Sequence, residues 1–259
     1  MTAAEHPVLE THGLTIRFGG HVAVNGVSCA FRAGTLTAIV GPNGAGKTTY
    51  FNLISGQLKA SSGRVSLFGE DISALGAPQR AKRGIGRAFQ LTNLFPRLSV
   101  HENVRLAVQA RAGMGRDLFS TWRSHTELLE KAEHFLHRVA LVDKRDSAAA
   151  TLPHGDQRKL EVAILLALEP DVFMFDEPTA GMSVDEVPVV LDLIRHVQAQ
   201  GDKTVLLVEH KMDVVRSLAD RIIVLHQGEL VADGEPESVI ASPIVQEAYL
   251  GIAKAPVHG

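Results

Sequence analysis

The chain has 259 residues, of which 45% are hydrophobic and 21% charged, and this composition is ordinary for a globular protein. Its net charge of −3 gives no electrostatic case for a nucleic-acid partner. A single cysteine, Cys29, excludes an internal disulfide, and no apolar run approaches the roughly 20 residues of a membrane helix. The first 13 residues lack the basic start and apolar stretch of a secretory signal, so we expect none.

Short strand-like runs alternate with helical patterns along most of the chain. The N-terminal runs LTIRF, VSCAFRAG, TLTAIVG and RVSLFGE are typical of strands, and so are the later runs IGRAFQ, DVFMFDEP, TVLLVEH and RIIVLHQGEL. VFMF and TVLLV are apolar at every position, as expected of strands buried on both faces of a parallel sheet. This alternation predicts an α/β fold.

The stretch from about residue 99 to 169 contains no convincing strand. It reads as a mostly helical block that is inserted into the α/β core. Two helix starts are indicated by capping boxes at Ser99 and Ser183, because each serine is followed three residues later by a glutamate.

Residues 41–48, GPNGAGKT, fit the pattern G-x-x-x-x-G-K-[ST] of a phosphate-binding loop. They follow a predicted strand and precede the helical pattern TTYFNLISG, which is the context that the motif requires. Glycines let successive backbone N–H groups turn towards a phosphate, and the next helix directs its positive end the same way. Lys47 supplies a charge for the β- and γ-phosphates, and the Thr48 hydroxyl is a Mg²⁺ ligand. We therefore expect nucleotide binding by Gly41, Pro42, Asn43, Gly44, Ala45, Gly46, Lys47, Thr48 and Thr49.

Two carboxylates, Asp176 and Glu177, end the apolar strand VFMF. Successive side chains of a strand point in opposite directions, so one carboxylate can hold Mg²⁺ while the other reaches a water. Nucleotide hydrolysis needs both roles. We assign Asp176 to the metal and Glu177 to polarising the attacking water. A pair of solvated carboxylates is the alternative, which the upstream phosphate loop disfavours.

Two further polar side chains end predicted strands. His210 ends TVLLVEH, where it can donate a hydrogen bond to the γ-phosphate, although a capped surface histidine is the plainer alternative. Gln90 closes IGRAFQ, where its amide can meet the metal shell or the attacking water. Without the other motifs, Gln90 by itself does not indicate a function.

These pieces, in this order, resemble the ATP-binding subunit of an ABC transporter. The phosphate loop looks like Walker A and residues 172–177 look like Walker B. Gln90 matches the Q-loop glutamine, His210 the switch histidine, and residues 180–183 the D-loop. Phe18 sits where the family places an aromatic ring to stack on adenine.

The resemblance implies a fold and a domain organisation. It spans about residues 8–251 and implies a P-loop NTPase (RecA-like) core with an N-terminal antiparallel β subdomain. These parts would occupy about 8–95 and 165–251, and an inserted α-helical subdomain would occupy about 96–165. We expect a single ABC ATPase domain.

Several segments look like the LivG-type ATPases of branched-chain and hydrophobic amino-acid uptake systems. They are RAFQLTNLFPRLSVHENV, DEPTAGM, VEHKMDVV and VIASPIVQEAYLG. The resemblance implies an ATPase that uses ATP and Mg²⁺ and lies peripherally on the cytoplasmic face of the inner membrane. Its partners would be integral membrane permease subunits, a second ABC ATPase and, indirectly, a periplasmic substrate-binding protein. The substrate stays open among branched-chain amino acids, amides, urea and aromatic acids.

The permease should dock near the Q-loop, where residues 89–96 include the apolar Leu94 and Phe95. Ordinary core burial is the alternative for these two side chains. A non-transport ABC ATPase, an exporter ATPase for a different substrate and an inactive scaffold also remain open. The single phosphate loop and the short helical block disfavour a non-transport ABC ATPase. The presence of Lys47, Glu177 and His210 disfavours an inactive scaffold.

Residues 152–156, LPHGD, take the place of the family signature LSGGQ. Pro153 lacks both a hydroxyl and a backbone N–H, while His154 replaces a glycine and offers a ring donor. Gly155 keeps its N–H, so His154 and Gly155 are expected nucleotide contacts. We expect Asp156 to turn away and cap the helix. In the family the signature serves the partner's nucleotide, so we hypothesise a heterodimer with unequal sites and keep a homodimer open.

Overall fold

The computed structural model describes residues 7–88, 94–113, 126–243 and 245–246. The strands are β1 (Leu9–Phe18), β2 (His21–Phe31), β3 (Leu36–Val40), β4 (Ser62–Leu67), β5 (Glu70–Asp71), β6 (Ile85–Ala88), β7 (Val172–Asp176), β8 (Thr204–Val208), β9 (Arg221–His226) and β10 (Glu229–Gly234). The α-helices are α1 (Lys47–Ser55), α2 (Ala77–Lys82), α3 (Val100–Arg111), α4 (Thr126–Arg138), α5 (His154–Leu168), α6 (Val187–Ala199), α7 (Met212–Leu218) and α8 (Pro236–Ala241).

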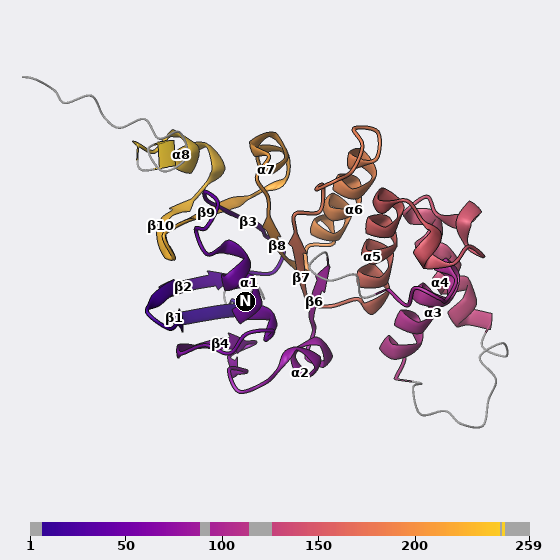
Figure 1. Ribbon diagram of the computed structural model, residues 1–259, viewed down its shortest axis with the longest axis horizontal. Helices are drawn as coiled ribbons and strands as arrows, with labels where there is room; N and C mark the ends of the chain where they lie inside the picture. Colours follow the sequence, from indigo (N-terminus) through magenta and orange to yellow (C-terminus); the bar gives the residue numbers. More distant parts are fainter. Residues whose placement is uncertain (1–6, 89–93, 114–125, 244, 247–259) are drawn as a thin grey trace, which may run out of the picture.

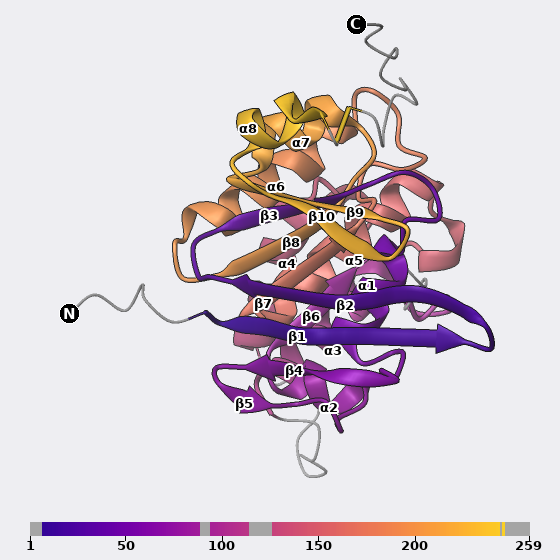
Figure 2. The same cartoon turned by 90° about the vertical axis from the view of Figure 1, so that its left-hand side faces the viewer.

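The strands of the described residues form two sheets. One is antiparallel, in the order β2-β1-β4-β5. The other has the order β10-β9-β3-β8-β7-β6, in which every pairing is parallel except that of the edge strand β10. Figure 1 shows the antiparallel sheet at one end of the molecule, and in Figure 2 β1, β2 and β4 run side by side across the front. The predicted α/β fold is confirmed.

The central strand β7 shows how side-chain alternation builds two cores. Val172 and Met174 pack in the cluster that also contains α1 and the antiparallel sheet. Phe173 and Phe175 point to the opposite face and join the cluster of α5 and α6. Successive strand residues face opposite sides, so a strand covered on both faces must be apolar throughout. The apolar run VFMF therefore reflects its place between two layers.

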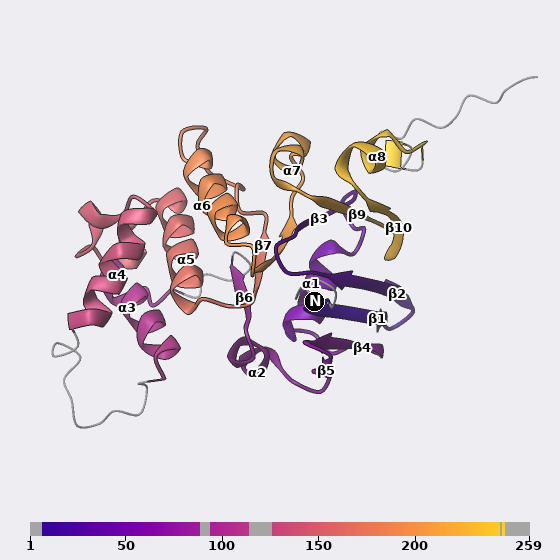
Figure 3. The same cartoon turned by 180° about the vertical axis from the view of Figure 1, so that it is seen from behind.

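The helices α3, α4 and α5 pack together at the end of the molecule opposite the antiparallel sheet (Figures 1 and 3). No strand interrupts the described residues of this block, as the sequence predicted. Ser99 caps α3 by accepting a hydrogen bond from the Glu102 N–H at 3.1 Å, which is the predicted cap. The buried Asn103 fastens the preceding loop, because its amide bonds both the N–H and the carbonyl of Phe95.

Two predicted strands, RVSLFGE and RIIVLHQGEL, contain hairpin turns in the structure. The run RIIVLHQGEL folds as the antiparallel hairpin of β9 and β10. Gln227 and Gly228 both have positive φ, 49° and 81°, as a two-residue type I′ turn requires. Phe68 and Gly69 make the same kind of turn between β4 and β5, with φ of 51° and 79°.

The second predicted capping box does not start a helix at Ser183. Helix α6 begins at Val187, and Pro188 lies in its first turn. A helix that began at Ser183 would place this proline in its interior, where the missing N–H and the ring oppose helical structure. The glutamate of the box, Glu186, still reaches back, and its Oε2 accepts hydrogen bonds from the N–H and the hydroxyl of Ser183.

Candidate functional site

A cavity of about 320 Å³ opens over the loop between β3 and α1. Helix α1 begins after Gly46, which has φ of 97°, and no described side chain caps it. A Cβ at Gly46 would lie 2.4 Å from the Ala23 carbonyl oxygen, so glycine is required there. The uncapped N–H groups and the positive end of α1 suit an anion. The cavity is lined by His21, Ala23, Asn43, Gly44, Ala45, Gly46, Lys47, Thr48, Thr49, Glu177 and His210.

Lys47 is held under this loop by the loop's own carbonyls. Its Nζ donates to the carbonyl oxygens of Gly41 at 2.7 Å and Pro42 at 3.0 Å. Its residue is only 6% exposed, and burial lowers the pKa of the ammonium below its ordinary value. The carboxylates of Glu177 and Asp176 partly offset this shift in pKa. The Lys47 ammonium is therefore a poorly solvated positive charge that can attract a phosphate.

Asp176 ends β7 in a buried ion pair that the sequence did not indicate. Its Oδ2 accepts from Arg87 Nη2 at 2.7 Å, and both side chains are 6% exposed. Arg87 Nη1 also donates to Asn52 Oδ1 at 2.7 Å and Ser55 Oγ at 3.0 Å on α1. The arginine thus connects β6, β7 and the helix that follows the phosphate loop. Burial lowers its pKa, and Asp176 opposes that effect.

Glu177 and His210 meet at the mouth of the cavity. The two atoms Glu177 Oε1 and His210 Nε2 lie 2.7 Å apart. Glu177 has φ of 52°, which is unusual for a residue with a side chain and is found preferentially at functional sites. Asp176 and Glu177 therefore contact different neighbours, but the cause is not strand alternation, because β7 ends at Asp176 and Glu177 follows it with a left-handed backbone. Whether they bind metal and water stays a prediction.

A buried carboxylate that sequence reasoning missed stands behind this pair. Glu209 is 3% exposed, and its Oε1 accepts from the Thr179 hydroxyl at 2.6 Å. Its Oε2 accepts from the His210 N–H at 2.9 Å. Glu209 therefore joins the segment after Glu177 to the segment that carries His210. The sequence signal was its place at the end of an all-apolar strand.

The family resemblance calls for Mg²⁺ beside the nucleotide, and the donors present fit it. Thr48 offers a hydroxyl at the cavity wall, and Asp176 offers a carboxylate of which Arg87 engages Oδ2. Mg²⁺ prefers oxygen ligands and takes only one or two from protein beside phosphate oxygens and water. Among the described residues no group of three or more His, Cys, Asp and Glu forms a metal site of protein ligands alone.

Among the described residues, the predicted contacts Phe18, His154 and Gly155 do not line this cavity. Phe18 ends β1 and pairs in register with His21, which does line the cavity; the phenyl residue itself is 50% exposed. Gln90 lies outside the described residues. His154 and Gly155 begin α5 and do not line the cavity, in keeping with a turn that would serve another chain. Their roles stay predictions.

One expectation about the signature turn is wrong. Asp156 does not cap α5, whose N-cap is Pro153 with no side-chain hydrogen bond. Its carboxylate instead pairs with Lys144 and with Lys159, the latter at 3.0 Å. The Asp156 side chain does turn away, as expected, and it turns towards the two lysines. Two ammonium groups satisfy a buried carboxylate better than the N–H groups of the first helical turn, to which Asp156 itself belongs.

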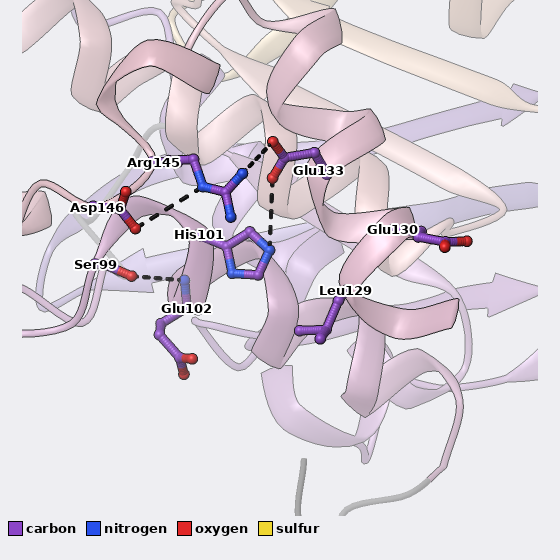
Figure 4. A pocket seen from close by; sticks show the side chains of 8 residues that line it. All are labelled: Ser99, His101, Glu102, Leu129, Glu130, Glu133, Arg145 and Asp146. Carbon is purple, nitrogen blue, oxygen red and sulfur yellow. Dashed lines mark hydrogen bonds and ion pairs between the residues drawn. The ribbon is translucent and has the colours of Figure 1, made fainter. Parts of the chain in front are cut away.

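A second hollow, of about 440 Å³, lies in the helical block and offers a different chemistry (Figure 4). Four of the side chains that line it, His101, Glu133, Arg145 and Asp146, contact one another. Arg145 Nη1 donates to Glu133 Oε1 at 2.7 Å, and His101 Nε2 lies 3.9 Å from Glu133 Oε2. It contains no glycine-rich turn at a helix start. The smaller cavity is therefore the candidate nucleotide site.

Comparisons with known proteins agree with this geometry. The ABC transporter family profile matches residues 24–180. The chain is 40% identical over 252 residues to the high-affinity branched-chain amino acid transport ATP-binding protein BraF of Pseudomonas aeruginosa, which covers 95% of this chain and 99% of that protein. It is 37% identical, with the same coverage, to the corresponding LivG of Escherichia coli.

Solved structures give the same result. The ADP conformation of an ATP-binding cassette of an ABC transporter superposes with a TM-score of 0.79 at 29% identity, covering 95% of this chain and 99% of that one. A cassette solved as a dimer in a post-hydrolysis state with ADP and Pi has a TM-score of 0.76 at 26% identity, with coverage of 88% and 98%. No helix in the described ranges is long and apolar enough to cross a membrane. The family profile and these relatives together show that the chain belongs to the ABC transporter family as one of its ATP-binding cassettes.

Proposed function

We propose that this chain binds and hydrolyses ATP to power an importer of branched-chain amino acids or of related small molecules. The observation that carries the proposal is the contact of Glu177 with His210 at the mouth of the cavity that holds Lys47. The identities of 37–40% to BraF and LivG support the substrate class. We place the chain peripherally on the cytoplasmic face of the membrane, bound to permease subunits and supplied by a periplasmic binding protein.

Different residues of this chain bind the phosphates, neutralise their charge and orient the attacking water. Backbone N–H groups of residues 43–49 bind the phosphates, and Lys47 neutralises charge that builds on the transferred γ-phosphoryl group. Glu177 accepts a hydrogen bond from the attacking water and orients it in line. His210, whose Nε2 contacts Glu177 at 2.7 Å in this structure without nucleotide, donates to a γ-phosphate oxygen once ATP is bound. Thr48, Asp176 and Gln90 would hold Mg²⁺, which would neutralise charge on the phosphates.

Two exposed aromatic side chains complete the proposal. Phe18, 50% exposed beside the cavity wall, stacks on the adenine ring. Phe95, 55% exposed just before α3, contacts the permease, whereas its neighbour Leu94 packs against the core of the helical block. Core burial therefore accounts for Leu94, and the docking role stays with Phe95.

The decisive experiment compares ATP hydrolysis by the assembled transporter that contains wild-type chain or Glu177→Gln. Loss of the carboxylate should lower turnover at this chain's site about 10²–10⁴-fold, while ATP binding persists because Lys47 and the loop are unchanged. Glu237→Gln, an exposed glutamate on α8, is the matched control and should retain full turnover. Equal activity of wild type and Glu177→Gln would contradict a transport motor built on this site.

We further propose that the second ATPase subunit is a different chain. The altered signature, with Pro153 at the N-cap of α5, then weakens only the partner's site. In a Glu177→Gln background the remaining turnover reports that site, so adding Pro153→Ser should raise it by about tenfold per 1.4 kcal/mol of recovered phosphate binding. Pro153→Ala, which restores the N–H without the hydroxyl, is the control. A Glu177→Gln transporter with no remaining turnover would instead indicate a homodimer.

A further inference from the structure

Lys159 occupies a position between two segments that lie far apart in the sequence. On α5 it faces Asp156, one turn earlier, with Nζ 3.0 Å from Asp156 Oδ1. On its other side Nζ lies 3.4 Å from Oε1 of Glu186, which precedes α6. The Lys159 side chain is 11% exposed, that of Asp156 7% and that of Glu186 25%. This lysine is therefore largely withdrawn from water and shared between two carboxylates.

Glu186 extends the connection into the loop after β7. Its Oε2 accepts from the Ser183 N–H at 3.0 Å and from the Ser183 hydroxyl at 2.9 Å. These hydrogen bonds hold the pKa of Glu186 below its ordinary value, with a smaller contribution from Lys159. A continuous chain of polar contacts thus runs from Asp156 through Lys159 and Glu186 to Ser183.

Two close approaches accompany this chain. A Cβ at Gly155 would lie 2.3 Å from the carboxylate oxygens of Glu186, so the glycine lets the loop sit directly on the start of α5. A Cβ at Gly181 would lie 3.2 Å from the ring of His154. The signature turn, residues 152–156, therefore approaches the segment 180–186, which begins with the D-loop (residues 180–183), at two places, and Lys159 bridges α5 to the same segment at a third.

We propose that Lys159 is a positioning residue that makes the signature turn and the D-loop of this chain one unit. The proposal rests on the proposed function, because in a dimer of cassettes both segments would face the partner's nucleotide. A unit that carries both segments presents them to the partner's phosphate in fixed relation, and it moves both when that phosphate leaves. Ordering within about 0.5 Å is what such contacts require.

An ordinary surface ion pair would not hold the two segments in a fixed relation. Exposed pairs contribute little to stability and leave both side chains mobile. Lys159 differs because its side chain is only 11% exposed, has two acceptors, and bridges α5 to a loop that has no helical structure of its own. Lys144 provides the matched comparison, since it also pairs with Asp156 but its side chain is 47% exposed, and no described contact joins it to Glu186.

The first test measures the unit in the isolated full-length chain without nucleotide. Nitroxide labels at Thr151→Cys and Val184→Cys report the separation of the two segments; Val184 is 88% exposed, and the native Cys29 is buried. Lys159→Met should broaden the interspin distance distribution roughly twofold, while Lys159→Arg and Lys144→Met should keep it narrow. An unchanged width in Lys159→Met would overturn the proposal.

Two further readouts guard against misfolding and separate this proposal from the proposed function. Glu186→Gln approaches the same contact from the other side and should broaden the distribution as Lys159→Met does, and the double variant should be no broader than either. In the assembled transporter with Glu177→Gln, Lys159→Met should lower the remaining turnover about two- to tenfold with KM for ATP unchanged. A raised KM with unchanged kcat would contradict positioning. If Glu177→Gln did not affect hydrolysis, the proposed function would be contradicted. The interspin distance distributions would still test the positioning role of Lys159 independently.

Discussion

The Nε2 atom of His210 lies 2.7 Å from the Oε1 atom of Glu177, although 33 residues separate them in the chain. Glu177 reaches this position from a backbone φ of 52°, a region that costs a non-glycine residue about 1–3 kcal/mol. The surrounding contacts keep it there, because the Glu177 N–H donates to the Val208 carbonyl at 2.9 Å. The strained backbone places the carboxylate at the cavity instead of along the strand.

This strain predicts a separation of stability from activity. Glu177→Gly should leave the free energy of unfolding unchanged or raise it by up to about 1 kcal/mol, because glycine adopts this φ freely. Hydrolysis should be lost, as no carboxylate remains to orient water. Glu177→Gln is the comparison, since it loses the charge and keeps the strain. Chemical denaturation of both variants checks the prediction, and a Glu177→Gly chain markedly less stable than Glu177→Gln would contradict it.

The buried pair of Arg87 and Asp176 predicts a large stability effect. Arg87→Met should lower the free energy of unfolding by about 3–5 kcal/mol, because it leaves the Asp176 carboxylate buried without its cation. Arg195→Met breaks a pair with Asp192 whose side chains are 47% and 71% exposed, and it should cost less than about 0.5 kcal/mol. Urea titrations of the two variants make the comparison. A similar loss for both would show that the buried pair is not special.

Local patterns predicted most of the fold and part of the candidate site. Strand runs, the glycine loop and the cap at Ser99 depend on residues within a few positions of one another, so they are readable in one dimension. The contacts of Arg87 with Asp176 and of Glu209 with Thr179 join residues 89 and 30 positions apart. Such pairs depend on which strands become neighbours, and single-residue patterns do not contain that information.

Two of the errors in the sequence predictions have local physical causes. The hairpin at Gln227 was read as one strand because glutamine gives no sign of a positive φ, although Gly228 beside it does. Asp156 was expected to cap α5 because acidic residues favour helix starts, but Lys144 and Lys159 offered stronger, charged donors. In both cases tertiary neighbours or a second residue decided between local alternatives.

Glu209 predicts a combined loss of stability and turnover. Glu209→Ala leaves the Thr179 hydroxyl and the N–H groups of His210 and Lys211 without their buried acceptor, so the free energy of unfolding should fall by about 2–3 kcal/mol. Turnover should fall about tenfold, since His210 loses its support. Glu209→Gln keeps an acceptor oxygen and should lie between Glu209→Ala and wild type. Thermal unfolding and ATPase assays check this, and an unaffected melting temperature would refute the bracing role.

The pairing of Asp156 predicts a stability difference that depends on pH. Burial alone would raise the pKa of this carboxyl, but hydrogen bonds from Lys144 and Lys159 outweigh it and set the pKa below the ordinary value of 3.8. A carboxyl with a depressed folded pKa binds protons less readily than in the unfolded chain. Its stabilisation is therefore complete above pH 3.8 and disappears as the pH falls through the folded pKa.

At pH 7 Asp156→Asn should be less stable than wild type by about 1–3 kcal/mol, and this gap should close below about pH 4. Asp192→Asn, in an exposed pair, should show only a small gap, and a pH-independent gap for Asp156→Asn would contradict the assignment.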